Sequence, residues 1–113
     1  LAASQFLPHA AASDQNPPQI VDGEVALMPA IAEALAAYRE AGFFGMEAPQ
    51  DEGGLGLPYT FVAAIGGLFS CANVATNGYA FLTQAAANLI REVGSDEQKR
   101  RFLPAMVEGR WFG

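Results

Sequence analysis

The spacing of apolar residues predicts an all-α protein, a bundle of about four main helices. The first helix is predicted over Pro29–Ala41, where Ile31, Leu35 and Tyr38 recur three or four positions apart and therefore share one face. Gly42 follows directly and is a typical left-handed helix stop. We expect this helix to turn its apolar face toward the core.

The next two helices are predicted in a stretch that carries no charged side chain, residues 53–90. They are expected to cover residues 59–72 and 75–93, which keep apolar residues at helical spacing. Gly66 and Gly67 lie in the middle of the first of them, where each glycine costs about 1 kcal/mol relative to alanine. The pair therefore suggests that another backbone lies against this point, or that the helix bends there.

The fourth helix has the clearest start signal in the chain. Ser95 and Gln98 have the spacing of a capping box, in which each side chain binds the other residue's backbone amide. Asp96 and Glu97 lie at the positive end of the helix dipole. The basic residues 99–101 that follow are more typical of a solvated helix face than of a binding patch.

An uncharged stretch of this length is expected to be shielded from water by lipid or by other protein segments. Residues 55–74 are long enough to cross a bilayer, but Pro58 and Asn73 interrupt them and no Lys or Arg flanks their ends. Small residues and scattered amides suit a packed helical interior better than hydrocarbon. We therefore expect a buried helical pair that is covered by further protein, and no membrane span.

Composition and charge narrow the classes of partner. The chain has 113 residues, which suffice for one domain, and 16% of them are charged, against roughly 25% in an average soluble domain. Six basic and twelve acidic residues give a net charge of −6, which argues against nucleic acid as a partner. The single cysteine, Cys71, excludes an internal disulfide framework and fits a reducing, cytoplasmic location.

Residues 1–28 are predicted to form an irregular lead-in. Pro17, Pro18 and small polar residues give it no periodicity, apart from a short turn at Asp22-Gly23. The start of the chain lacks the basic region of a signal peptide. Because the chain ends directly after an aromatic pair, we expect it to be a fragment of a longer protein.

No residue has the setting of a catalytic group or of a metal or cofactor ligand. The glycine-rich turn at residues 53–56 is no phosphate cradle, because Asp51 and Glu52 would repel a phosphate and neither a strand before the turn nor a Lys after it completes the motif. The other acidic residues lie in predicted turns and on solvated helix faces, and His9 lies in the lead-in. We predict a structural turn and no catalytic residue.

Two segments resemble one enzyme family. Residues 94–106, GSDEQKRRFLPAM, are similar to the G-[ST]-x-E-Q-K-x-x-[FY]-L-P-x-[LM] segment of acyl-CoA dehydrogenases. Residues 49–56, PQDEGGLG, resemble the P-x-x-x-G-G-x-G turn of the same family, and the resemblance covers residues 29–113. Residues 25–43 and 69–73 are most similar to the branch that acts on methylthiopropionyl-CoA.

The resemblance implies the N-terminal helical domain of a three-domain, FAD-dependent oxidoreductase of fatty acid metabolism. In this family a middle β-domain holds most of the FAD, and a C-terminal helical domain supplies the glutamate base. Both domains would lie outside this chain, which would be inactive alone. The implied partners are an acyl-CoA substrate, an electron-transfer acceptor protein and further copies of the same chain in a homo-oligomer.

The resemblance also places substrate-binding positions, those that line the acyl cavity, at Asn77, Phe81 and Ala85. Their spacing at i, i+4 and i+8 puts them on one stripe of a helix. A bulky ring such as that of Phe81 at the cavity floor would favour a short acyl chain. The same spacing is equally typical of ordinary packing between helices.

Other function classes stay open beside the dehydrogenase. A non-catalytic helical interaction module would have to hide its uncharged helices by self-association, because a large exposed apolar surface is a partner or aggregation site. An acyl-CoA oxidase, or a nucleic-acid-associated member of the same superfamily, would share the N-terminal domain. The acidic balance of the chain argues against the nucleic-acid reading.

Overall fold

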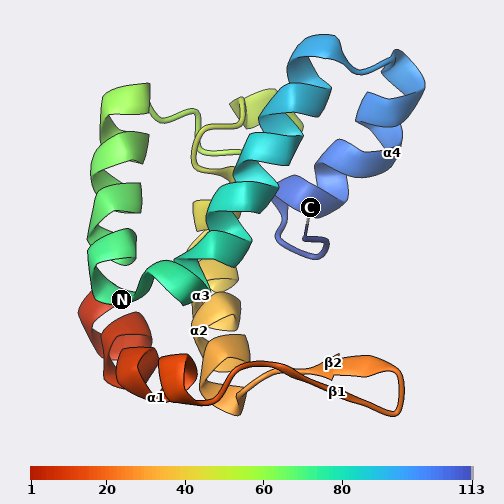
Figure 1. Cartoon of the computed structure of the whole chain (residues 1–113). Coiled ribbons are helices and arrows are strands. Elements are labelled where there is room, and N and C mark those ends of the chain that lie inside the picture. Colours follow the sequence, from red (N-terminus) through yellow and green to blue (C-terminus); the bar gives the residue numbers. More distant parts are fainter. Residues whose placement is uncertain (113) are drawn as a thin grey trace.

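The computed structural model describes residues 1–112 and shows four α-helices with one small hairpin (Figure 1). The predicted all-α class is therefore confirmed. In chain order the α-helices and strands are α1 (Ala10–Gln15), β1 (Gln19–Val21), β2 (Glu24–Ala26), α2 (Pro29–Glu40), α3 (Tyr59–Val93) and α4 (Asp96–Val107). Short helical turns lie at Ala2–Phe6, Leu7–His9, Phe43–Gly45 and Gln50–Glu52.

Helix α2 begins at Pro29 and buries the face that its sequence predicts, and it ends at Glu40, one residue before the predicted end at Ala41. Ile31, Leu35 and Tyr38 are 6%, 5% and 1% exposed. The helix is followed by Gly42 with a φ of 75°, a left-handed conformation that glycine adopts without steric cost. The chain then reverses into the Phe43–Gly45 turn, which carries two aromatic side chains back toward the helix.

Helix α3 consists of two limbs that meet at Asn73, whose φ of −163° and ψ of 95° are not helical. We call residues 59–72 the first limb and residues 74–93 the second limb. Figure 1 shows them, in green and in teal, diverging from this point. The Asn73 side chain accepts a 3.1 Å hydrogen bond from the backbone amide of Thr76, as an N-cap does. The prediction of two separate helices here is confirmed.

The first fifteen residues differ from the irregular lead-in that the sequence suggests, because they form helical turns that are part of the core. Phe6 is completely buried, and its ring centroid lies 4.8 Å from that of Phe69. His9 is 7% exposed, and its Nε2 lies 2.9 Å from the hydroxyl of Thr76. The prediction of an irregular segment over residues 1–28 is therefore wrong for this part of the chain.

The Asp-Gly turn predicted in the lead-in is present as a hairpin. Strands β1 and β2 pair antiparallel, and Asp22 and Gly23 between them have φ values of 52° and 81°. Two successive positive φ angles are the geometry that favours Asn-Gly and Asp-Gly in two-residue hairpin turns. The hairpin extends away from the helices (Figure 1), and Ile20 on it is 79% exposed.

The core has two parts. The larger part is an aromatic cluster in which the Tyr38 ring lies 4.8 Å from Phe69 and 5.2 Å from Phe44. The smaller part joins the second limb of α3 to α4 through Ala87, Leu103 and Met106. Helix α2 and the N-terminal turns thus hold the kink region of α3, while α4 holds its C-terminal end.

Helix α4 begins with the capping box that its sequence predicts. The backbone amide of Gln98 donates to the hydroxyl of Ser95 at 3.2 Å, and the amide of Ser95 donates to the Gln98 side chain at 2.8 Å. This start fixes where the chain turns back after α3. The helix then packs antiparallel to the end of the second limb, as the blue and teal segments of Figure 1 show.

Both limbs of α3 expose large apolar side chains that the described residues leave uncovered. Leu68 on the first limb is 66% exposed, and Leu89 and Val93 on the second limb are 64% and 75% exposed. Within residues 1–112, α3 alone is long and apolar enough to cross a membrane, by length and composition only. The break at Asn73, with its buried polar contacts, divides that helix and weakens a spanning interpretation.

Candidate functional site

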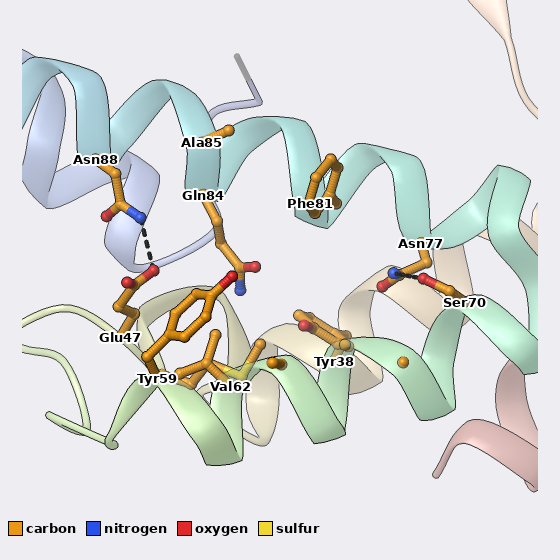
Figure 2. Close-up of a pocket in the computed structure, with 14 residues that line it drawn as sticks. Tyr38, Glu47, Tyr59, Val62, Ser70, Asn77, Phe81, Gln84, Ala85 and Asn88 are labelled. Atoms are coloured by element: carbon orange, nitrogen blue, oxygen red, sulfur yellow. Dashed lines mark hydrogen bonds between the residues drawn. The ribbon is translucent and has the colours of Figure 1, made fainter.

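A cavity of about 320 Å³ lies between the two limbs of α3, with α2 and the segment after it behind (Figure 2). The limbs are joined at Asn73 and their axes diverge from that point (Figure 1). They therefore leave a wedge-shaped space that the side chains do not fill. The lining residues are Tyr38, Met46, Glu47, Tyr59, Val62, Ala63, Gly66, Gly67, Ser70, Asn77, Phe81, Gln84, Ala85 and Asn88.

All three residues predicted to line an acyl cavity line this one. Asn77, Phe81 and Ala85 lie along one stripe of the second limb (Figure 2) and line the cavity. Asn77 is 3% exposed, whereas Phe81 is 62% exposed. Within the described residues, the Phe81 ring therefore lines the open side of the cavity. It does not close the cavity as the floor that the resemblance implied.

The opposite wall explains the glycine pair of the first limb. A Cβ atom added at Gly66 or Gly67 would meet no other atom within 4 Å, so no backbone packs against them. The first limb has no break in its helical angles at these positions. The helix does not bend at these glycines, and no described residue brings its backbone against them, so neither interpretation drawn from the sequence is met within this chain. The glycines instead leave space opposite Phe81.

Polar pairs mark the two ends of the cavity (Figure 2). At the narrow end Asn77 donates a 2.9 Å hydrogen bond to the hydroxyl of Ser70 and so links the limbs near the kink. At the wide end Asn88 donates a 2.6 Å hydrogen bond to the carboxylate of Glu47. The stretch between the pairs is lined mainly by small and apolar side chains.

The wall behind the cavity contributes a buried phenol. Tyr38 is 1% exposed, and burial raises the pKa of its hydroxyl to about 12, with a side-chain hydrogen bond to Gln84 acting in the opposite direction. Gln84 also donates to the backbone carbonyl of Phe43 at 2.7 Å. Tyr38 is therefore a neutral group at physiological pH, and Gln84 is held in a fixed orientation.

A second set of polar contacts lies beyond the wide end. Arg91 donates to the carboxylate of Glu52 at 2.8 Å and also to the side-chain oxygen of Asn88. Asn88 thus connects the Glu47 carboxylate, inside the cavity, to an ion pair outside it. This arrangement ties the segment before α3 to the second limb.

The glycine-rich turn at residues 53–56 does not hold a phosphate. All four of its backbone amides donate to carbonyl oxygens of the chain, those of Gln50, Pro49, Gly45 and Ala48. A side chain at Gly54 would collide with the Ala48 carbonyl, which explains the glycine there. The predicted structural turn is confirmed, and an FAD pyrophosphate would find no free amides at this turn.

The described residues also contain no grouping of three His, Cys, Asp or Glu side chains that would suit a metal ion. His9, the one histidine of the chain, is used in the buried contact with Thr76. The geometry can therefore bind and orient a small, mostly apolar group, and the carboxylate that lines the cavity, that of Glu47, lies at its wide end.

Sequence reasoning missed part of this site. Tyr38 looks like an ordinary core residue, and Glu47 lies in a turn with no periodicity, so neither was a candidate. A signal was available in Gly66-Gly67. These two glycines lie in an uncharged helix next to the helix that carries the predicted stripe with Phe81. Such a pair is consistent with a cavity beside the helix as well as with close helix packing.

Comparison with known proteins agrees with the family resemblance. The chain is 28% identical over 100 residues, 88% of its length, to the 3-methylmercaptopropionyl-CoA dehydrogenase of Ruegeria pomeroyi. It is 34% identical over 68 residues, 60% of its length, to the mitochondrial isobutyryl-CoA dehydrogenase of Dictyostelium discoideum. The matched parts make up 17% and 16% of those two relatives. Residues 2–110 match the acyl-CoA dehydrogenase N-terminal domain, and the chain belongs to that family.

Proposed function

We propose that this chain forms the N-terminal domain of an FAD-dependent acyl-CoA dehydrogenase, in which the cavity between the limbs of α3 holds the acyl group. The observation that carries the proposal is the meeting of Asn77, Phe81 and Ala85 with Gly66 and Gly67 in one mostly apolar cavity. An acyl chain would gain about 0.8 kcal/mol for each methylene that it buries there.

In this proposal the complete enzyme, and not this domain alone, catalyses the α,β-dehydrogenation of an acyl-CoA thioester. The cavity lining is mostly apolar, so we assign these residues to binding and orientation of the acyl group. Their contribution is a wall that keeps water from the acyl group and fixes its position relative to the reacting carbons.

The acyl chain length gives a direct test of the cavity. In the full-length protein, Phe81→Ala should shift the kcat/KM preference toward acyl-CoA substrates that are longer by one to two methylenes, by roughly fourfold for each. Leu82→Ala is the matched control, since Leu82 is 58% exposed on the same limb and lies outside this cavity. An unchanged chain-length profile for Phe81→Ala would contradict the assignment.

The flavin is tested separately, by the visible absorption spectrum of the full-length protein purified without added cofactor. A flavin spectrum that bleaches when an acyl-CoA is added supports the dehydrogenase proposal. A colourless protein that cannot be reconstituted with FAD would refute it, because the chemistry then has no electron acceptor within the protein.

We also propose an electron-transfer acceptor protein as partner, a homo-oligomeric state and a cytoplasmic location for this protein. The exposed apolar side chains of α3, such as Leu68 and Leu89, favour a covered state in the assembled protein. The free thiol of Cys71 is exposed, which suits a reducing compartment.

Two alternative functions are a non-catalytic helical interaction module without flavin and an acyl-CoA oxidase-like enzyme. The observation that favours an interaction module is the same exposed face of α3, which would be covered by a second copy. A colourless protein that sediments as a stable dimer would support it. Hydrogen peroxide release during acyl-CoA turnover would instead identify an oxidase.

A further inference from the structure

One charged side chain lines the cavity within the described part of the chain, and it is the carboxylate of Glu47. The remaining lining residues are aliphatic, aromatic, amide, hydroxyl or glycine residues. Figure 2 shows Glu47 at the wide end, opposite Asn88 and beside Tyr59. A single carboxylate in an otherwise neutral cavity sets the sign of the electrostatic potential that a bound group experiences.

The backbone on either side of Glu47 is held in place by burial and by hydrogen bonds. Met46 and Ala48 are 1% and 4% exposed. The Met46 carbonyl accepts a 2.8 Å hydrogen bond from the amide of Leu57, and the Ala48 carbonyl accepts a 2.9 Å hydrogen bond from the amide of Gly56. The segment that carries Glu47 is therefore paired with the approach to α3, which fixes its backbone beside the cavity, and the hydrogen bond from Asn88 orients its carboxylate.

The charge of Glu47 is not cancelled by an ion pair with a residue that the structure describes. Its hydrogen-bond partner is the neutral side chain of Asn88. The nearby cation, Arg91, is paired with Glu52 on the other side of Asn88. Glu52 balances Arg91, so no described cation pairs with the carboxylate inside the cavity, which retains free acceptor capacity.

We infer that Glu47 determines which acyl groups the cavity accepts, admitting acyl groups that are uncharged or carry a hydrogen-bond donor at the end that reaches it and rejecting those that end in a carboxylate. This inference rests on the proposed function. Two carboxylates within one partly desolvated cavity repel each other, and none of the described residues that line it carries a positive charge to offset the repulsion. Glu47 is thus a specificity-determining residue and takes no part in bond making.

The test compares acyl-CoA substrates of equal length that end in a methyl group, a hydroxyl group or a carboxylate. In the full-length protein, kcat/KM for the carboxylate-terminated substrate should be at least about tenfold lower than for the methyl-terminated one. Glu47→Gln, which keeps the size and the hydrogen bond to Asn88, should reduce that ratio to within about threefold.

The matched control is Glu52→Gln, which removes the same charge from the same group of contacts but outside the cavity. It should leave the ratio between the two substrates as it is in the unaltered protein. If Glu47→Gln fails to fold, as judged by thermal unfolding, Glu47→Asp takes its place; this variant withdraws the carboxylate by one methylene and should give partial relief.

The outcomes separate this inference from the proposed function. Equal kcat/KM values for the methyl- and carboxylate-terminated substrates in the unaltered protein overturn the inference, and so does equal relief by Glu47→Gln and Glu52→Gln. A protein that oxidises none of the acyl-CoA substrates overturns the proposed function, and the inference with it. Discrimination that only the Glu47 variants relieve supports both.

Discussion

The two limbs of α3 have similar compositions but are held in different ways. The second limb buries Thr76, Asn77, Ala80, Thr83 and Ala87, which are small or polar residues spread along its length. The first limb buries only Val62 and Phe69. One limb is therefore fixed along its whole length against its neighbours, while the other is attached chiefly near the kink. The difference teaches that an uncharged helix need not be a buried helix.

The first and largest test of this comparison is Phe69→Ala. The Phe69 ring contacts those of Phe6, Tyr38 and Phe43, so its removal should leave a cavity at the point where the first limb is attached. We expect a loss of about 3–5 kcal/mol in the free energy of unfolding, measured by urea denaturation. Leu68→Ala, at an exposed neighbour, should cost less than about 1 kcal/mol. Equal losses would contradict the unequal attachment of the first limb.

The second test measures how protein stability depends on pH. It concerns Tyr38 of α2, whose ring contacts Phe69 where the first limb is attached. The pKa of Tyr38 is raised to about 12 by burial, against about 10 in an unfolded chain. Between these two values the folded state keeps a proton that the unfolded state has lost, so stability falls as pH rises from 10 to 12. We expect a loss on the order of 2 kcal/mol across this window.

Tyr38→Phe provides the control for the pH experiment, because it keeps the ring and removes the titrating hydroxyl. Other groups that titrate above pH 10 contribute equally to both proteins. The difference between the two stability curves should therefore open above pH 10 and stop growing above pH 12. Parallel curves throughout would show that Tyr38 is not buried as described.

The smallest expected effect comes from Gly67→Ala on the first limb. An added Cβ meets no other atom there, and alanine is the better helix former, so the free energy of unfolding should rise by up to about 1 kcal/mol. A backbone packed against Gly67, as the sequence suggested, would give the opposite result. A loss of stability, measured by thermal denaturation, would mean that another backbone does pack against this face.

Much of the fold was predictable because its signals are local. The stop at Gly42 and the capping box at Ser95 depend on neighbouring residues, and both are present as expected. The break between the limbs, at Asn73, falls between the two predicted ranges 59–72 and 75–93. The stripe of Asn77, Phe81 and Ala85 needed only the helical period to be placed on one face.

The features that could not be predicted depend on contacts between distant segments. Residues 2–15 lack periodicity because single side chains, Phe6 above all, anchor short turns to the core. Glu47 reaches the cavity because its turn is paired with the approach to α3, and no pattern within the turn reports that pairing. The space beside Gly66 exists only because the limbs diverge, which depends on the angle at the kink.

The contacts around Asn73 have a consequence for where the domain boundary is drawn. Its side-chain amide donates to the carbonyl of Phe6 at 3.3 Å, and Thr76 meets His9, in both cases 67 positions apart in the chain. A boundary placed at Pro29, where the first long helix starts, would leave these buried groups without partners and uncover the ring of Phe69. The first turns and the middle of α3 therefore form one folding unit, and substitutions at either are expected to covary.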